Sequence, residues 1–281
     1  MDAATKDMEQ QQVEALLGSG IQIPPQPQVL IELEKTINHP RASTASIAKV
    51  VTQDAALTAA VFKVINSPAY GLRRKIDSLD QAISVIGMKQ MANIIKSVAL
   101  RQAMGGKDPF YELFWERSGE IAQLSAIIAA KQRSVCNLVP DQVYMAGLFH
   151  DCGIPVLMQR FPDYCKTLRE AKTCDWSGIG AEDQRLHTDH CIAGYMVARH
   201  WQLPDFICQA VRFHHDILHA EHQATTLVAI LQLAMHIYNV YHNQDDREWA
   251  TVQSKVLSEL GLGKEGLKEF EEDVYDTLHS A

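Results

Sequence analysis

Apolar residues recur at helical spacing along most of this chain. The side chains of Leu57, Val61, Val64 and Ile65, for example, would share one face of a helix, because residues three and four positions apart are neighbours on a helix surface. Apolar and polar residues nowhere keep up the alternation of period two that a half-buried strand requires. We therefore predict an all-α fold, built as a multi-helix bundle.

Capping residues predict where several of these helices begin. Ser43 can cap a helix that runs to Val51, and Asp54 can start the next helix, because short polar side chains accept hydrogen bonds from the free N–H groups of a first turn. Ser78, followed by Gln81 three residues later, has the spacing of a capping box.

Breaks in the helical pattern divide the chain into segments. Gly105-Gly106 and Asp108-Pro109 interrupt the stripes and form the best candidate boundary. The predicted segments are a polar tail at residues 1–20, an N-terminal helical half at 21–108, a second helical half at 109–243 and closing helices at 244–281.

Charge and composition argue against some kinds of partner. The net charge is −8 and no long basic block occurs, so a nucleic acid, whose phosphates need clustered Lys and Arg, is not an expected partner. No stretch approaches about 18 uncharged apolar residues, so we expect no membrane span. The six cysteines form no C-x-x-C pair, which indicates reduced thiols in a cytoplasmic protein; Cys152 and Cys191 are interpreted as small buried residues.

One His-Asp pair, His150-Asp151, follows an apolar helical run, and a glycine, Gly153, comes two residues after it. Imidazole and carboxylate are complementary ligands for Zn, Mn or Fe. Adjacent side chains on a helix point about 100° apart, so we expect that the two cannot both face a core but can both bind an ion at a helix end. The alternative is a charged turn that ends a helix.

Three further histidines, His190, His214 and His215, each belong to a predicted helix or helix end. Helical bundles build metal sites from side chains that project inward from several helices, so these residues join His150 and Asp151 as candidate ligands. The alternatives are a core histidine at His190 and a solvated pair at a helix end. Other histidines are interpreted as surface or core residues, His236 among them.

A long, ordered set of motifs, together with the His-Asp pair, resembles the HDOD family, the HD-related output domains of bacterial signalling within the HD phosphohydrolase superfamily. The resemblance covers roughly residues 21–240 and implies an N-terminal helical layer packed on an HD-like helical core. The matching motifs are Ile23-Pro24 to Leu33, Gln53-Asp54-Ala55-Ala56-Leu57, Asn66-Ser67-Pro68-Ala69-Tyr70-Gly71, and Ile76-Asp77-Ser78-Leu79-Asp80-Gln81-Ala82-Ile83 followed by Ile86-Gly87.

The resemblance also implies that the metal site has degenerated. In an active HD hydrolase the ion is held by a His on an earlier long helix, by the His-Asp pair and by a late Asp; here Arg117 and Met235 occupy the first and last positions. Neither a guanidinium nor a thioether suits a hard ion. The HD-GYP relatives, which cleave cyclic di-GMP, add a Lys and three His for a second ion, and this chain has Pro155 at the Lys position but retains His190, His214 and His215.

Two states of the site remain open from the sequence. The remaining ligands could hold one divalent ion (Fe, Mn or Zn), with the charge of Arg117 disfavouring a second. Alternatively, Arg117 could pair with Asp151 and fill the site with a salt bridge, which is stable only when well hydrogen-bonded.

The resemblance favours a stand-alone HDOD-type signal-transduction or interaction protein, non-catalytic, with signalling proteins as partners. The loop at residues 66–74 is the candidate binding surface, with the residues Asn66, Ser67, Tyr70 and Gly71; an ordinary helix-terminating loop is the alternative. The second hypothesis is a metal-dependent phosphohydrolase acting on a nucleotide or cyclic dinucleotide. A third is a sensor that binds a nucleotide without turnover.

Overall fold

The computed structural model describes residues 20–72, 74–106, 108–171, 188–220 and 222–280, together with Gly18 and Leu186. Every regular element in these ranges is a helix, as predicted. The predicted tail at residues 1–20 lies outside the described residues, apart from Gly18 and Gly20.

The first group of helices leads up to the predicted boundary. Its members are α2 (Gln28–Ile37), α3 (Thr44–Val51), α4 (Ala55–Ile65), the 3-10 turn η1 (Pro68–Tyr70), α5 (Leu79–Ile86) and α6 (Met88–Ala103).

The second group follows the break at Asp108-Pro109. Its members are α7 (Phe110–Lys131), α8 (Pro140–Phe149), α9 (Gly153–Arg160), α10 (Lys166–Ala171), α12 (His190–His200), α13 (Asp205–Phe213), α14 (His222–Tyr241), α15 (Trp249–Leu260), the 3-10 turn η3 (Lys264–Gly266) and α16 (Leu267–His279).

The predicted caps are present at three helix starts. The hydroxyl of Ser43 accepts a hydrogen bond from the Ser46 N–H, and the hydroxyl of Ser46 accepts one from the Ser43 N–H, so α3 opens with a full capping box. Asp54 caps α4, and Ser78 caps α5 by accepting from the Gln81 N–H. Local sequence therefore sets these boundaries.

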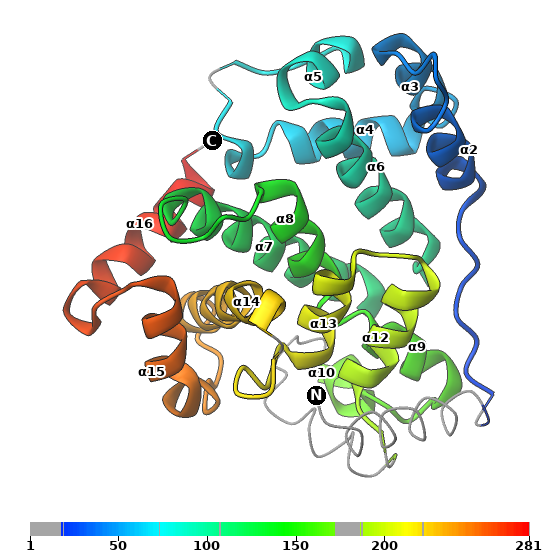
Figure 1. The fold of residues 1–281 in the computed structure, drawn as a ribbon. Helices are drawn as coiled ribbons and strands as arrows, with labels where there is room; N and C mark the ends of the chain where they lie inside the picture. The colour runs from blue at the N-terminus through cyan, green and yellow to red at the C-terminus, as the bar shows by residue number, and fades with distance from the viewer. Residues whose placement is uncertain are drawn as a thin grey trace.

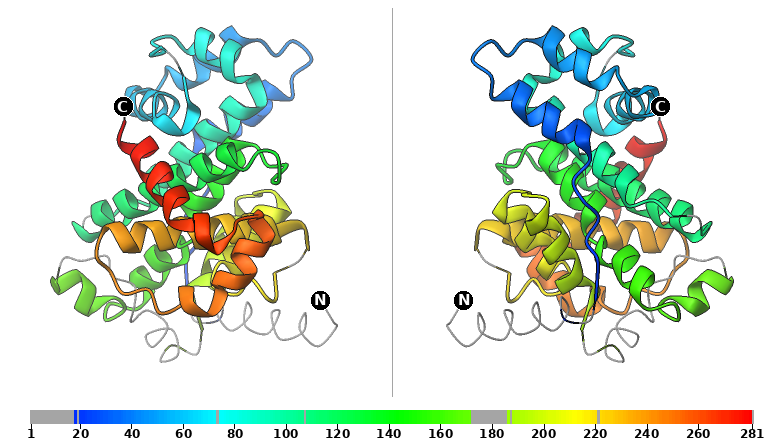
Figure 2. Two further views of the ribbon diagram at one scale, coloured as in Figure 1. Left: turned by 90° about the vertical axis from the view of Figure 1, so that its left-hand side faces the viewer. Right: turned by 90° about the vertical axis from the view of Figure 1, so that its right-hand side faces the viewer.

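The two groups of helices lie as two stacked layers (Figures 1 and 2). Helices α2 to α5 form one layer, α6 runs from that layer onto α8, and α7 passes through the middle of the molecule. A continuous apolar core joins both layers and includes Leu57, Ile95, Leu124 and Leu231. Although the two halves share this core, the division of the chain into four segments stays a prediction.

An extended segment, residues 21–27, runs along the side of the molecule from the second layer to α2 (Figure 1). The indole Nε1 of Trp201, which is fully buried, donates a hydrogen bond of 2.8 Å to the Pro24 carbonyl. Prolines favour an extended path and have no backbone N–H to donate. The Trp201 side chain, at the end of α12, therefore anchors this segment through a backbone carbonyl.

Helix α14 has an 18-residue window, Ala224–Tyr241, that is long and apolar enough to cross a membrane by length and composition alone. Of that window, 72% is buried inside the fold. Since α14 packs on α7, α13 and α15, its apolar character is accounted for by its place in the core.

Candidate metal centre

The five predicted ligands lie together where four elements meet. Asp151, in the turn between α8 and α9, is the central group: its Oδ2 lies 3.0 Å from His150 Nε2, and its Oδ1 lies 3.1 Å from His214 Nε2 and 3.4 Å from His190 Nε2. The centre of the His215 ring lies 4.2 Å from the centre of the His214 ring. These five side chains therefore lie close to one another, and their role as metal ligands stays a prediction.

Two glycines, Gly153 of α9 and Gly194 of α12, allow these helices to come this close. A Cβ added to Gly153, at the start of α9, would lie 1.9 Å from the His190 carbonyl oxygen and 2.6 Å from the Gly194 nitrogen. Only a residue without a side chain fits such a backbone crossing. The crossing sets the first turn of α12 directly against the α8–α9 turn, and so places His190 beside Asp151.

The expectation that His150 and Asp151 cannot both face a core is wrong. Their exposed fractions are 0% and 2%. Helix α8 ends at Phe149 and His150 still has helical backbone angles (φ −52°, ψ −41°), so an angle of about 100° between neighbouring side chains does not by itself prevent both from being buried. Neighbouring helices also cover the turn on more than one side, since Arg117 of α7 and His190 of α12 both contact Asp151.

Arg117 occupies one side of the Asp151 carboxylate. Its Nη1 donates to Asp151 Oδ2 at 2.7 Å and lies 3.4 Å from His150 Nε2. The guanidinium carbon is 5.4 Å from the centre of the Tyr238 ring, a cation–π arrangement. The structure thus contains the ion pair between Arg117 and Asp151 that one of the two predicted states requires.

Asp151 is held ionised although it is buried. Burial alone would raise the pKa of this carboxyl, but His150, the hydrogen bond with His214 and the Arg117 guanidinium outweigh it and hold the pKa well below its ordinary value. The centre therefore contains a fixed negative charge that requires positive neighbours.

The backbone fixes the orientation of two histidines. Nδ1 of His150 lies 2.7 Å from the Gly147 carbonyl, and Nδ1 of His214 lies 2.7 Å from the Val211 carbonyl. A histidine whose Nδ1–H donates to a carbonyl presents Nε2 as the free ligand atom, the arrangement common among metal-binding histidines. Both Nε2 atoms face Asp151.

For His214 this arrangement leaves an electrostatic conflict. Burial, then the neighbouring His215, lowers the pKa of His214 well below its ordinary value, although Asp151 opposes the shift, so the ring carries one proton. With that proton on Nδ1, Nε2 and Asp151 Oδ1 are two acceptors 3.1 Å apart; with it on Nε2, Nδ1 and the Val211 carbonyl conflict instead. A cation bound between the ring and the carboxylate would resolve the conflict.

The two oxygens of Asp151 therefore have different environments. On the Oδ2 side, Arg117 places a positive charge beside both the carboxylate and His150. On the Oδ1 side lie the Nε2 atoms of His190 and His214. A metal ion would fit the donor set of the second side, whereas the guanidinium already fills the first.

Glu248 was not singled out from the sequence. It lies just before α15, and its Oε2 is 2.6 Å from His215 Nδ1, while its Oε1 accepts a 3.4 Å hydrogen bond from Gln232 Nε2. A carboxylate on the far nitrogen of a histidine orients the ring and makes it a stronger ligand. Because 33 residues separate the two, no local pattern could have indicated this pair.

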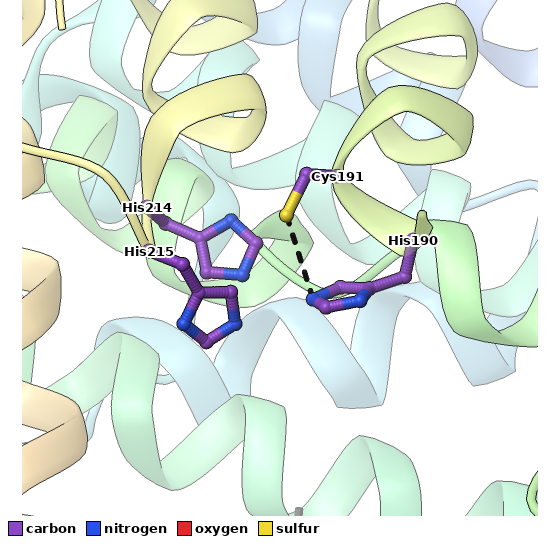
Figure 3. A group of neighbouring side chains, drawn as sticks. All are labelled: His190, Cys191, His214 and His215. Carbon is purple, nitrogen blue, oxygen red and sulfur yellow. Dashed lines mark hydrogen bonds between the residues drawn. The ribbon is translucent and has the colours of Figure 1, made fainter. Parts of the chain in front are cut away.

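Cys191 has a larger place here than the sequence suggested. It is buried, as predicted, but its sulfur lies 3.6 Å from His190 Nε2. The ligand atoms of His190, Cys191, His214 and His215 all lie within 4.8 Å of one another. Figure 3 shows two pairs that face each other, from the start of α12 and the end of α13. In the sequence, the only sign that Cys191 belongs to this cluster was its position next to His190.

The predicted departures from the HD pattern are all buried. Pro155 lies in the first turn of α9 and Met235 on α14. Neither can supply a charge or a strong ligand to a hard ion.

The predicted interaction loop is tied into the fold. Asn66 makes two hydrogen bonds with the backbone of Ile76, donating to its carbonyl at 2.9 Å and accepting from its N–H at 2.7 Å. Tyr70 ends η1, and burial, followed by the nearby Tyr144 and Asp141, raises the pKa of its hydroxyl well above the ordinary value. Gly71 adopts a left-handed φ of 57°. The role of this loop in binding a partner stays a prediction.

Comparison with known proteins agrees with this architecture. A family model described as the HDOD domain matches residues 23–217. An uncharacterized protein of Treponema pallidum (strain Nichols) is 24% identical over 213 residues, which make up 75% of this chain and 41% of that relative. The chain thus spans less than half the length of the curated relative it matches.

Two solved structures share the fold. An HDOD domain protein with unknown function from Geobacter sulfurreducens has a TM-score of 0.66 at 22% identity, covering 96% of this chain and 98% of its own. A protein described as "Putative metal-dependent phosphohydrolase" from Shewanella amazonensis SB2B has a TM-score of 0.73 at 19% identity, covering 97% and 98%. At these identities the likeness establishes the fold.

Proposed function

The chain belongs to the HDOD family, and we propose that it is a cytoplasmic signalling and interaction module whose HD-type centre is closed by Arg117 and does not catalyse hydrolysis. The observation that carries this proposal is the 2.7 Å hydrogen-bonded ion pair between Arg117 and Asp151. Other signalling proteins are the proposed partners, and neither a nucleic acid nor a membrane is expected.

Electrostatics supports a closed centre. Hydrolysis of a phosphoester at such a site needs an ion that lowers the pKa of water and neutralises developing charge. A divalent ion about 4 Å from the Arg117 guanidinium would be opposed by roughly 8 kcal/mol at an effective dielectric constant of 20. Arg117 also occupies Asp151 Oδ2, so the ion would lose one ligand oxygen as well as meeting this repulsion.

The second candidate function is a metal-dependent phosphohydrolase acting on a nucleotide or cyclic dinucleotide. It is favoured by the three histidine Nε2 atoms around Asp151 and by the acceptor conflict at His214. In that case His190, His214 and Asp151 would hold an ion on the Oδ1 side, and the ion would supply an activated water.

Phosphodiesterase assays on untagged protein separate the two functions. We expect the wild type to leave bis(p-nitrophenyl) phosphate and cyclic di-GMP uncleaved in the presence of Mn, Fe or Zn. An Arg117→His variant, which replaces the cation by a metal-ligand type, should bind more Mn or Fe than the wild type. The exposed Arg247→Met variant is the matched control, and its metal content should equal that of the wild type.

The proposal has a clear contrary result. Hydrolysis by the wild type that is abolished in His150→Ala, with an unchanged far-ultraviolet circular dichroism spectrum, would show that the centre is catalytic. The phosphohydrolase hypothesis would then replace the one proposed here.

A further inference from the structure

Helix α16 is the last helix that the structure describes, and it lies on the outside of the molecule (Figures 1 and 2). It packs against α7 and against the η1 turn, which belongs to the predicted interaction loop. Its Tyr275 ring stacks on the Tyr241 ring of α14, with the ring centres 3.6 Å apart. Two of its side chains, Leu267 and Val274, are buried, whereas most described residues of α14 are buried. Helix α16 therefore holds to the protein by a narrow apolar face.

The link between α15 and α16 is short and rich in glycine. It contains Gly261, Gly263 and Gly266, and Gly261 has a left-handed φ of 64°. No atom lies within 4 Å of a Cβ added to Gly263 or Gly266, so neither is packed against a neighbour. Glycine has more backbone freedom than any other residue, and hinges consist of a few loop residues that absorb changes in φ and ψ. The link is therefore suited to act as a hinge for α16.

Two ion pairs join α16 to the helices beneath it. Lys131 Nζ on α7 lies 2.6 Å from Asp273 Oδ2, and His236 Nε2 on α14 lies 3.3 Å from Glu271 Oε1. The Asp273 side chain is 62% exposed, and exposed pairs contribute little stability. His236 also contacts Asp246, 2.6 Å from its Nδ1, without help from α16. Undocking of α16 therefore leaves neither cation buried without a counter-charge.

The loop against which α16 packs contains two hydroxyls that lack a partner. The hydroxyl oxygens of Ser67 and Tyr70 are buried, and neither makes a hydrogen bond within the described part of the chain. A buried polar group without a partner is costly, so each one in a folded protein calls for an explanation. Both residues lie in or next to η1, which contacts α16. A loop that gains its hydrogen-bond partners from another protein accounts for both.

We propose that α16 is a hinged cover over the η1–α7 surface, and that an acidic amphipathic helix of a signalling partner takes its place there. The η1–α7 surface consists of η1 and the side of α7 on which α16 packs, with Lys131 and His236 at its edge. This inference rests on the proposed function, because it assigns a binding surface to that interaction module. In the covered state α16 blocks the surface.

The residues of α16 define the chemistry of the partner. Its apolar side chains recur at helical spacing and pack on the core: Leu267, Phe270, Val274 and Leu278. This is the pattern of a helix that binds in a groove through its apolar face. Around that face its acidic residues are Glu269, Glu271, Glu272, Asp273 and Asp276. A partner helix with the same pattern would meet Lys131 and His236 as α16 does, so the two helices exclude each other.

An exchange of charge between the chain and a peptide tests the cover. The probe is a fluorescein-labelled peptide of residues 264–280 that carries Asp273→Lys, and binding is followed by fluorescence anisotropy. In the full chain, Lys131→Asp repels the chain's own Asp273 and attracts the cation of the peptide. We expect this variant to bind the peptide roughly tenfold or more tightly than the wild type does, because the exchange weakens the covering helix and strengthens the peptide.

Two controls separate docking from general electrostatics. Lys49→Asp makes the same change of charge at an exposed position of α3, which packs on α2, α4 and α5, so this chain should bind the peptide as weakly as the wild type. A peptide that carries Val274→Asp in addition should bind none of the chains, because Val274 is 0% exposed and an unpaired charge at that position would have to be buried.

Hydrogen exchange reports whether the peptide displaces α16. When the peptide binds the Lys131→Asp chain, the amides of the chain's own residues 267–279 should exchange faster than in the free chain, because a helix that has lost its docking surface opens locally. The amides of α14 should keep their protection, since α14 lies in the core. A peptide bound elsewhere would leave α16 unchanged.

The contrary outcomes are distinct from failure of the proposed function. Equal affinity of the three chains for the peptide, or unchanged exchange of α16 in the complex, would overturn the cover and leave the Arg117-closed module standing. A wild-type dimer that forms with rising concentration in gel filtration and is lost in Lys131→Asp would mean that α16 of a second copy fills the surface, and would overturn the assignment to a partner. The proposed function itself fails only through hydrolysis that His150→Ala abolishes.

Discussion

The crossing of α9 and α12 at Gly153 makes a quantitative prediction about stability. A Cβ at this position would meet the His190 carbonyl oxygen at 1.9 Å, whereas ordinary contact begins at 3.4 Å. Because the obstacle is backbone and cannot rotate away, α12 would have to move by about 1.5 Å within a close-packed core.

We therefore expect Gly153→Ala to cost about 3 kcal/mol or more, the upper end of the range for overpacked cores. For a chain of this size each kcal/mol lowers Tm by about 2–4 °C, so thermal unfolding followed by circular dichroism should show a fall of roughly 6–12 °C or more.

Gly263→Ala is the matched control. Its φ is −86° and no atom lies within 4 Å of a Cβ added there, so its stability should stay within about 0.5 kcal/mol of the wild type. If Gly153→Ala has the same Tm as Gly263→Ala, α9 and α12 are not in contact at Gly153. The explanation of how His190 comes to lie beside Asp151 would then be wrong.

The remaining predictions concern an ion cluster and a loop. His236 lies 2.6 Å from Asp246 and 3.3 Å from Glu271; burial alone would lower its pKa, but the two carboxylates outweigh burial and raise it. A raised folded-state pKa gives a contribution that is full below the unfolded value of about 6.5 and is lost as pH rises through the folded value. The stability gap between wild type and His236→Gln in urea unfolding should therefore shrink from about pH 6 to about pH 9, and a gap that widens would contradict the ion cluster. Asn66→Ala, which removes both hydrogen bonds to Ile76, should cost about 1–3 kcal/mol in the same assay; a change below about 0.5 kcal/mol would mean that these bonds do not hold the loop.

The helices were predictable because their signals are local. Ser43, Asp54 and Ser78 each cap the helix that follows them, since a cap is an interaction between residues three positions apart. The apolar stripes face one shared core. The helical spacing of the apolar residues therefore indicated both the class of fold and most buried positions.

For the candidate centre, the sequence indicated the five candidate ligands and Arg117, but it indicated neither Glu248 nor the arrangement of these side chains in space. Motif order brought together His150, Asp151, His190 and His214, but the distribution of partners around the Asp151 carboxylate depends on helices far apart in the sequence. Arg117 is 34 residues from Asp151, and sequence alone could not decide whether it faced the carboxylate or solvent. Burial of the His-Asp pair was missed because a single sequence does not show that Arg117 of α7 and His190 of α12 both cover this turn.

Glu248 and Cys191 show two other limits. The bond between Glu248 and His215 joins α15 to α13 across 33 residues, and nothing in a single sequence reports such a contact. Cys191 was visible beside His190, but a buried cysteine is most often a small apolar residue. Only the folded chain shows that its sulfur lies 3.6 Å from His190 Nε2.

The segment at residues 21–27 has a consequence for how the chain is made. Its anchor, the bond from Trp201 to Pro24, joins positions 177 residues apart. A ribosome that adds roughly 5–20 residues per second takes about 9–35 s to cover that stretch. Throughout this time the segment has no docking site, because α12 does not yet exist. The η1 turn packs against α7 and α16, so its contact with α16 forms later still. A nascent chain stalled before α12 would therefore offer residues 21–27 to proteases, whereas the finished protein would protect them.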